Sequence, residues 1–179
     1  MAHFECKFPY EEILPQNTEE DIVSFEQRIG YKLPSGYRQF LLEHNGIHFN
    51  QSLGVIWTKD EFEEYPICEV YGFFGITMER NNNIETLQEG YKFKDRVPKG
   101  YYAIANTPVP AQFICISLNE ENYGRVYYWH TISSTAHEFE EPHTTEYLYP
   151  ISSSFQGFWD NIRDLKELQI EMDIDESWR

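Results

Sequence analysis

The sequence predicts an α+β fold, in which a mostly antiparallel sheet is covered by an N-terminal helix pair and a C-terminal helix. Three observations lead to this expectation. Helical periodicity marks residues 18–46, short β-branched and aromatic runs follow from residue 53 to residue 129, and helical spacing returns after residue 152. Strands flanked in sequence by helices are typical of an α+β domain whose helices pack on one face of the sheet.

The chain is expected to form a single domain over residues 1–179. Its 179 residues are 41% hydrophobic and 17% aromatic, which is enough to build one substantial core. The core is expected to span about residues 18–168. Pro9 and Pro15 predict an irregular N-terminus over residues 1–16, and the chain after Leu168 becomes an acidic tail.

The first helix is predicted to follow Thr18, a good N-cap residue with acidic side chains in the turn after it. Ile22, Phe25 and Ile29 recur at helical spacing, so they should form one apolar face. Gly30 can adopt the left-handed conformation that ends a helix.

A second short helix is predicted after Pro34, which suits a first helical turn because its missing N–H has no partner there. Tyr37, Phe40 and Leu41 form its inward stripe, and Asn45-Gly46 ends it. The residues that we assign to the core from these patterns and from the last strand are Phe25, Leu33, Tyr37, Phe40, Leu41 and Trp129.

The middle of the chain consists of short apolar runs that favour strands. These runs are residues 53–57, 67–71, 73–76, 101–105, 112–118 and 126–129. Residues 84–91 have near-helical spacing and predict a third short helix. A hairpin-like loop is expected at 119–124, and a long polar loop with an edge strand at 133–150.

A closing helix is predicted to begin around residues 152–154. Its apolar side chains stand three or four positions apart and should pack together on the sheet. They are Phe155, Phe158, Trp159, Ile162 and Leu165.

The charge balance restricts the classes of partner. Thirty acidic against 14 basic residues give a formal net charge of -16. Such a surface repels phosphate, so we expect neither direct nucleic-acid binding nor docking on anionic membranes. It would attract a basic protein and accelerate the encounter. An acidic surface that only keeps the protein in solution is the alternative.

The sequence carries no recognisable catalytic signature. Its three cysteines are widely spaced, so they suggest neither a disulfide framework nor a structural zinc site. His44 and His48 have a spacing that could place two imidazoles on one helical face, but Asn45-Gly46 between them should end the helix. We therefore expect a non-enzyme without catalytic residues, metal or cofactor. The N-terminus does not resemble a signal peptide, so a cytoplasmic location is expected.

Three segments interleave aromatic and acidic residues, around Phe62, Tyr123 and Phe139. Rings supply contact area at an interface, and carboxylates complement Lys and Arg. Alternatively the rings lie in the core and the acids are solvated. As candidate partner-binding residues we select the carboxylates of these segments: Glu61, Glu63, Glu64, Glu120, Glu121, Glu140 and Glu141.

Several motifs resemble the SUKH superfamily, which includes fungal cell-wall-assembly regulators and bacterial immunity proteins. The first is the helix pair, with its Leu-Pro-x-x-Tyr-x-x-Phe-Leu core at residues 33–41 and Asn-Gly at 45–46. The strands ending in Gly-Arg-Val-Tyr-Tyr-Trp at 124–129 and the closing segment 151–159 are similar to the family as well. His48-Phe49 and the polar insertion at 133–147 depart from the family pattern, and both are expected in loops.

The resemblance implies an α+β fold and, for bacterial members, a non-catalytic immunity protein in the cytoplasm. Such a protein binds a cognate toxin, often a nuclease or a deaminase that acts on nucleic acids, and occludes its active site. A basic toxin domain would match the acidic charge of this chain. Two alternatives stay open: a regulatory scaffold that recruits signalling partners, and an unrecognised hydrolase. The toxin and the oligomeric state stay undetermined at this level.

Overall fold

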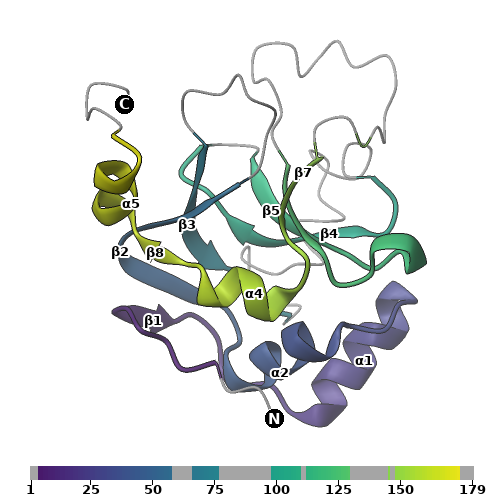
Figure 1. The fold of residues 1–179 in the computed structure, drawn as a ribbon. Helices are drawn as coiled ribbons and strands as arrows, with labels where there is room; N and C mark the ends of the chain where they lie inside the picture. The colour runs from purple at the N-terminus through teal and green to yellow at the C-terminus, as the bar shows by residue number, and fades with distance from the viewer. Residues whose placement is uncertain are drawn as a thin grey trace.

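The computed structural model describes residues 4–57, 66–76, 98–109, 112–129, 145 and 148–173. Its helices lie beside a curved sheet, as Figure 1 shows. The α+β prediction is confirmed. The predicted helix at 84–91 lies outside the described residues, as does most of the polar loop 133–147.

Within the described residues the sheet has eight strands: β1 (Tyr10–Glu12), β2 (Ile47–Ile56), β3 (Ile67–Phe73), β4 (Tyr101–Asn106), β5 (Phe113–Ser117), β6 (Val126–Trp129), β7 (Leu148–Ser152) and β8 (Arg163–Asp164). Strands β1 to β7 pair in sequence order, each antiparallel to its neighbour, and β8 pairs with β2. Among the residues that the structure describes, β7 is the last strand in this order, in agreement with the expected edge strand. The order keeps strands that are neighbours in sequence side by side in the sheet.

The first two helices are α1 (Glu19–Ile29) and α2 (Ser35–Glu43). Thr18 accepts a hydrogen bond from the backbone N–H of Asp21, and the Asp21 carboxylate accepts one from the N–H of Thr18, which forms a capping box. Gly30 ends α1 with φ of 74°, in the left-handed conformation that its lack of a Cβ permits. Both helices therefore begin and end close to the residues that the sequence indicated.

An aromatic cluster joins the helices to the sheet. The Phe40 ring of α2 is fully buried, and its centroid lies 4.9 Å from that of Phe73 in β3 and 5.1 Å from that of Phe155. Phe4 and Trp159 complete the cluster around Phe40. Tilted and edge-to-face rings at these separations add to the free energy gained from burying their area. All residues assigned to the core are buried: Phe25, Leu33, Tyr37, Phe40, Leu41 and Trp129.

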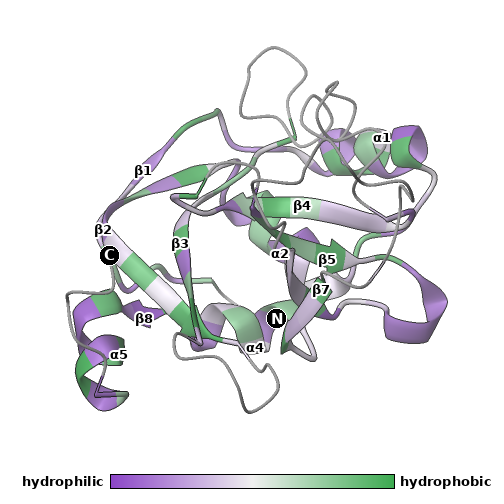
Figure 2. Cartoon of the chain, turned by 90° about the horizontal axis from the view of Figure 1, so that it is seen from above, coloured by the Kyte–Doolittle hydropathy of each residue, from purple (hydrophilic) through white to green (hydrophobic). Residues whose placement is uncertain are grey.

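The single closing helix predicted from residue 152 onward is wrong, because the segment forms two helices with a short strand between them. Helix α4 (Phe155–Asp160) ends at Asn161, then β8 pairs with Leu53 and Gly54 of β2, beyond the part of β2 that pairs with β1, and α5 (Leu165–Glu171) follows. The Asp164 carboxylate accepts hydrogen bonds from the N–H groups of Lys166 and Glu167, so it caps a new helix. Figures 1 and 2 place α5 beside β2, on the side of the molecule away from α1.

The N-terminal segment is more regular than predicted, since residues 10–12 form β1. The prolines flank this strand, and the Pro9 carbonyl accepts a hydrogen bond from the N–H of Asn50. Strand β2 begins at Ile47, so His48 and Phe49 lie in a strand and not in a loop. Gly46, with φ of 82°, turns the chain directly from α2 into this strand.

The end of α2 holds the N-terminal segment. The Phe4 N–H donates to a Glu43 carboxylate oxygen at 2.8 Å, and the Phe4 carbonyl accepts from His44 Nε2 at 2.9 Å. His44 Nδ1 lies 2.6 Å from a Glu12 carboxylate oxygen. Both ring nitrogens of His44 are therefore within hydrogen-bonding distance of the N-terminal segment. These contacts keep the Phe4 side chain in the core.

Candidate protein-binding groove

A groove opens where the start of α2, the start of α4 and the loop before β6 meet. We call it the α2–α4 groove. Its volume is about 550 Å³, within the range of pockets that bind small molecules or side chains. The described residues that line it are Pro34, Ser35, Gly36, Gln39, Tyr123, Gly124, Ser153, Ser154, Phe155 and Gln156.

The first turn of α2 forms part of the groove floor. Pro34 is the residue before the helix and supplies no side-chain cap, so the N–H groups of the first turn have no partner within the helix. Ser154, in contrast, caps α4 by accepting a hydrogen bond from the N–H of Gly157 at 3.1 Å. The floor therefore offers hydrogen-bond donors from the α2 backbone and serine hydroxyls from both elements.

One wall of the groove is held by hydrogen bonds between distant segments. The Tyr123 hydroxyl donates to the Lys32 carbonyl at 2.9 Å, and the next residue, Leu33, donates its N–H to a Glu26 carboxylate oxygen at 3.0 Å. The other Glu26 oxygen accepts from Lys32 Nζ at 2.6 Å. Burial and the negative charge of Glu26 raise the pKa of the Tyr123 phenol, which keeps it a donor. The loop that precedes α2 is thus fixed from both sides.

The charge state of Glu26 follows from these contacts. Burial raises the pKa of the carboxyl, but the hydrogen bonds from Lys32 and Leu33 and the positive charges of Lys32 and Arg38 outweigh this effect. The pKa therefore lies below its usual value. Glu26 is an ionised, almost fully buried carboxylate that fixes the loop leading into the groove.

The short helix η1 (Glu120–Asn122) precedes the groove wall and is rigidly held. Asn122, its last residue, donates from its side-chain amide to the Tyr101 hydroxyl at 2.6 Å and the Tyr127 hydroxyl at 3.1 Å. The side-chain carbonyl of Asn122 accepts a hydrogen bond from the Ser117 hydroxyl. The Gly124 N–H donates to the backbone carbonyl of Ser117 at 2.8 Å. A partner that binds here would lose little free energy to loop ordering.

Carboxylates lie around the groove. Glu120 and Glu121 are exposed on η1, immediately before the groove wall. Two groove-lining glutamines donate their amide N–H groups to further carboxylates, Gln39 to Glu43 at 2.8 Å and Gln156 to Asp160 at 2.9 Å. The carbonyl oxygen of Gln156 is buried and has no hydrogen-bond partner among the described residues.

The basic residues near this surface are mostly neutralised. Lys32 pairs with Glu26, and the Arg38 guanidinium pairs with the Glu19 carboxylate. Arg125 follows the wall and is exposed. The described lining residues carry no formal charge, and the exposed carboxylates around them, Glu120, Glu121 and Asp160, outnumber the exposed cation of Arg125, so the rim of the groove is net negative.

The structure describes two of the predicted partner-binding residues, Glu120 and Glu121, and places both on the surface beside the groove. The other predicted residues lie outside the described part: Glu61, Glu63, Glu64, Glu140 and Glu141. Sequence reasoning missed the serines and glutamines of the groove. The signal that could have indicated them is the Leu-Pro-Ser-Gly start of α2, which lacks a capping side chain.

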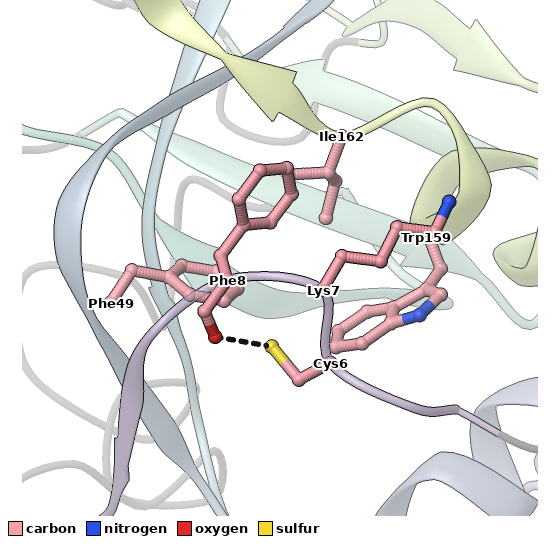
Figure 3. Close-up of a pocket in the computed structure, with 6 residues that line it drawn as sticks. All are labelled: Cys6, Lys7, Phe8, Phe49, Trp159 and Ile162. Atoms are coloured by element: carbon pink, nitrogen blue, oxygen red, sulfur yellow. Dashed lines mark hydrogen bonds between the residues drawn. The ribbon is translucent and has the colours of Figure 1, made fainter.

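Another, much smaller pocket lies beside the N-terminal segment and is lined by Cys6, Lys7, Phe8, Phe49, Trp159 and Ile162 (Figure 3). Its volume is about 10 Å³, roughly the space for one water molecule. The Cys6 thiol donates to the Phe8 carbonyl, and burial is the main cause that raises its pKa. A protonated thiol is a poor nucleophile. This pocket therefore does not favour the hydrolase hypothesis.

The histidines at positions 44 and 48 do not form a shared metal site in the structure. Both ring nitrogens of His44 are hydrogen-bonded, to Glu12 and to the Phe4 carbonyl. The His48 ring packs edge-on against Tyr71, with 4.4 Å between the ring centroids. Within the described ranges, no group of three or more metal-ligating side chains comes together. None of the helices in those ranges is long and apolar enough to cross a membrane.

Comparison with known proteins identifies the family. A family model described as the SMI1 / KNR4 family (SUKH-1) matches residues 16–161. The chain belongs to this family. The match includes every residue named above as lining the α2–α4 groove.

A relative of this SUKH-1 chain is the SPbeta prophage-derived uncharacterized protein YokK of Bacillus subtilis (strain 168). It is 25% identical over 159 residues, covering 79% of this chain and 72% of the relative. The alignment therefore extends over most of both proteins.

Proposed function

We propose that this protein is a non-catalytic immunity protein that binds a basic nuclease or deaminase toxin domain and occludes its active site. Membership of the SUKH-1 family is the observation that carries the proposal. The partner is a protein, and the complex contains no cofactor. The setting is the cytoplasm, where a toxin that acts on nucleic acids would meet its substrate.

The charge of the chain supports this choice of partner. A domain that cleaves or deaminates nucleic acids needs a basic surface for the phosphate backbone. A protein of net charge -16 presents the opposite field, which accelerates association and favours that basic surface over neutral proteins. An inhibitor that covers a phosphate-binding surface needs no chemistry of its own.

The surface around η1 supports a contact role for Glu120 and Glu121. Both carboxylates are exposed, and the hydrogen bonds of Asn122 hold the backbone that carries them. Carboxylates on a rigid loop pair with Lys or Arg at a smaller entropic cost than carboxylates on a flexible one. Glu61, Glu63, Glu64, Glu140 and Glu141 belong to the same proposal as further contacts.

The test begins with the proteins encoded next to the gene of this chain. Each is expressed with the chain, and any complex is characterised by calorimetry and by the nuclease or deaminase activity of the partner. We expect one partner to bind tightly and to lose its activity at stoichiometric inhibitor. Binding that leaves the activity unchanged would point to the scaffold alternative, and failure of every neighbour to bind would contradict the immunity function.

Charge reversal then tests the η1 contact. The double variant Glu120→Lys/Glu121→Lys should slow association with the toxin by about tenfold or more at low salt, because it replaces attraction with repulsion. The control is Glu20→Lys/Glu167→Lys, which changes the net charge equally on exposed helix positions away from the groove. Equal association rates for the two double variants would remove η1 from the contact surface.

A further inference from the structure

We infer that the α2–α4 groove is the docking site for a short extended segment of the partner protein that carries Lys or Arg side chains. In this arrangement a backbone carbonyl of the segment accepts hydrogen bonds from the start of α2, and its cationic side chains reach the carboxylates of the rim. This inference rests on the proposed function for the identity of the partner and adds the surface and the chemical nature of the bound segment.

The groove floor explains why the occupant is a peptide and not only a cation. The first turn of α2 has no side-chain cap, so its N–H groups at Ser35 and Gly36 are available to an external acceptor. A peptide carbonyl is an acceptor without net charge, so it suits these donors and escapes the repulsion that the surrounding carboxylates exert on an anion.

The rim explains why the segment is basic. Glu120 and Glu121 flank the Tyr123 wall, and Asp160 receives a hydrogen bond from groove-lining Gln156. Against these carboxylates stands the exposed cation of Arg125. The local sum is negative, so Lys or Arg side chains of the occupant would be attracted.

The groove also offers a preformed contact surface. Tyr123 is 46% exposed although its hydroxyl is held by the Lys32 carbonyl, so the ring presents a fixed face to the groove. Pro34 lies against the same wall, and a Cβ on Gly124 would stand 3.3 Å from the Pro34 Cβ. The side-chain carbonyl oxygen of groove-lining Gln156 is buried and lacks a hydrogen-bond partner among the described residues, so it is an acceptor that a donor of the occupant could satisfy. A rigid aromatic wall with nearby polar groups is typical of peptide-binding sites.

The first experiment requires no knowledge of the toxin. The probe is a blocked peptide that alternates glycine and lysine, titrated into the ¹⁵N-labelled protein at an ionic strength of about 0.01 M, where exposed charges are weakly screened. We expect the amide signals of Ser35, Gly36 and Gly124 to shift most. Two controls are run: the same peptide with glutamine for lysine, and spermidine, which is cationic but has no carbonyl.

The expected pattern separates the two parts of the inference. The glutamine peptide should bind at least about tenfold more weakly, because the attraction of the rim is lost. Spermidine should shift signals near the rim but leave the amides of Ser35 and Gly36 in place. Peptide-induced shifts centred on other acidic surfaces, such as the start of α1, would overturn the inference, and so would a spermidine response at Ser35 equal to that of the peptide.

A matched pair of variants tests the same surface. Ser35→Lys places a cation at the groove floor, whereas Ser24→Lys makes the same change on the exposed side of α1. We expect Ser35→Lys to weaken lysine-peptide binding about tenfold or more and Ser24→Lys to leave it within about twofold. Equal weakening by both would mean that only the net charge matters, and the groove would be excluded. Unfolding curves confirm that both variants are folded.

The outcome for the toxin is separate. If a neighbouring toxin is bound and inhibited equally well by the wild type and by Ser35→Lys, the immunity function stands and the groove assignment falls. If the lysine peptide occupies the groove but no neighbour is inhibited, the docking site stands and the proposed function falls. Each result therefore bears on one of the two proposals.

Discussion

Replacing Glu26 with glutamine tests how the groove wall is held. The carboxylate is 4% exposed and accepts hydrogen bonds from the Leu33 N–H and from Lys32 Nζ. Glutamine has nearly the same shape, and its carbonyl oxygen can still accept the Leu33 N–H. The change therefore removes the negative charge and the ability to accept from Lys32, and it leaves the packing almost intact.

The magnitude follows from the exposure of each partner. The bond to the buried Leu33 N–H changes from a charged to a neutral acceptor, which costs about 1 kcal/mol. Lys32 is 76% exposed, so its ion pair contributes only about 0–1 kcal/mol after solvent screening. With a small contribution from Arg38, we expect Glu26→Gln to lower the free energy of unfolding by about 1–3 kcal/mol at neutral pH.

The pH dependence has a defined sign. The pKa of Glu26 in the folded protein lies below its usual value, so the ionised carboxylate stabilises the fold at any pH above its unfolded pKa. This stabilisation disappears as the pH falls through the lower pKa of the folded state. Glutamine does not titrate there, so the difference between wild type and Glu26→Gln should be constant near neutral pH and shrink in acid, below about pH 4.

The assay is urea unfolding followed by tryptophan fluorescence at several pH values between neutral and acid. Glu5→Gln serves as the control, because it removes one charge from an exposed carboxylate in the N-terminal segment. The control should change the free energy of unfolding by less than about 0.5 kcal/mol. Equal stability of Glu26→Gln and wild type at neutral pH would refute the reasoning, and so would a difference that does not decrease in acid.

Three further predictions concern the groove and the core. Gly36→Ala should raise the free energy of unfolding by up to about 1 kcal/mol in urea titrations, because alanine favours a helix and the nearest atom to an added Cβ is 3.8 Å away. A lower free energy of unfolding would mean that the groove floor has no room for the methyl group. Asn122→Ala should lower the free energy of unfolding by about 1–3 kcal/mol in the same assay and increase hydrogen exchange at the Gly124 amide, because it removes the hydrogen bonds to two tyrosine hydroxyls. Unchanged exchange would contradict the rigidity of this loop. Phe40→Ala should lower the free energy of unfolding by about 3–5 kcal/mol, because the ring is fully buried among other aromatic rings, and the loss should appear as a lower midpoint of thermal unfolding. A loss below about 1 kcal/mol would contradict the central place of Phe40 in the core.

Local chemistry explains why the helix pair could be predicted so closely. Thr18 and Gly30 act through the backbone of their own helix, and the stripe of Tyr37, Phe40 and Leu41 depends only on the helical period. The strands at 101–106 and 113–117 were similarly evident, because they are rich in β-branched and aromatic residues. Such signals do not require knowledge of distant parts of the chain.

The closing segment shows where local reasoning fails. Phe155, Phe158 and Leu165 follow one helical period, and all are buried as expected. Yet the chain leaves the helix at Asn161, because the part of β2 beyond its pairing with β1 offers backbone hydrogen-bonding groups to β8. The competing partner of residues 163–164 is more than 100 positions away in sequence, so periodicity alone contained no information about it.

For the candidate site, too, the sequence determined some features and the tertiary structure determined others. By itself, the sequence determined the acidic charge, the presence of Glu120 and Glu121 beside an aromatic residue, and a family resemblance that the comparison confirmed. Only the tertiary structure decided that these carboxylates stand next to a groove formed with α2 and α4. A concave surface is built by segments that meet through long-range packing, as when the Tyr123 hydroxyl reaches the Lys32 carbonyl across 91 positions of sequence. Composition and periodicity describe each segment, but the cavity exists only between them.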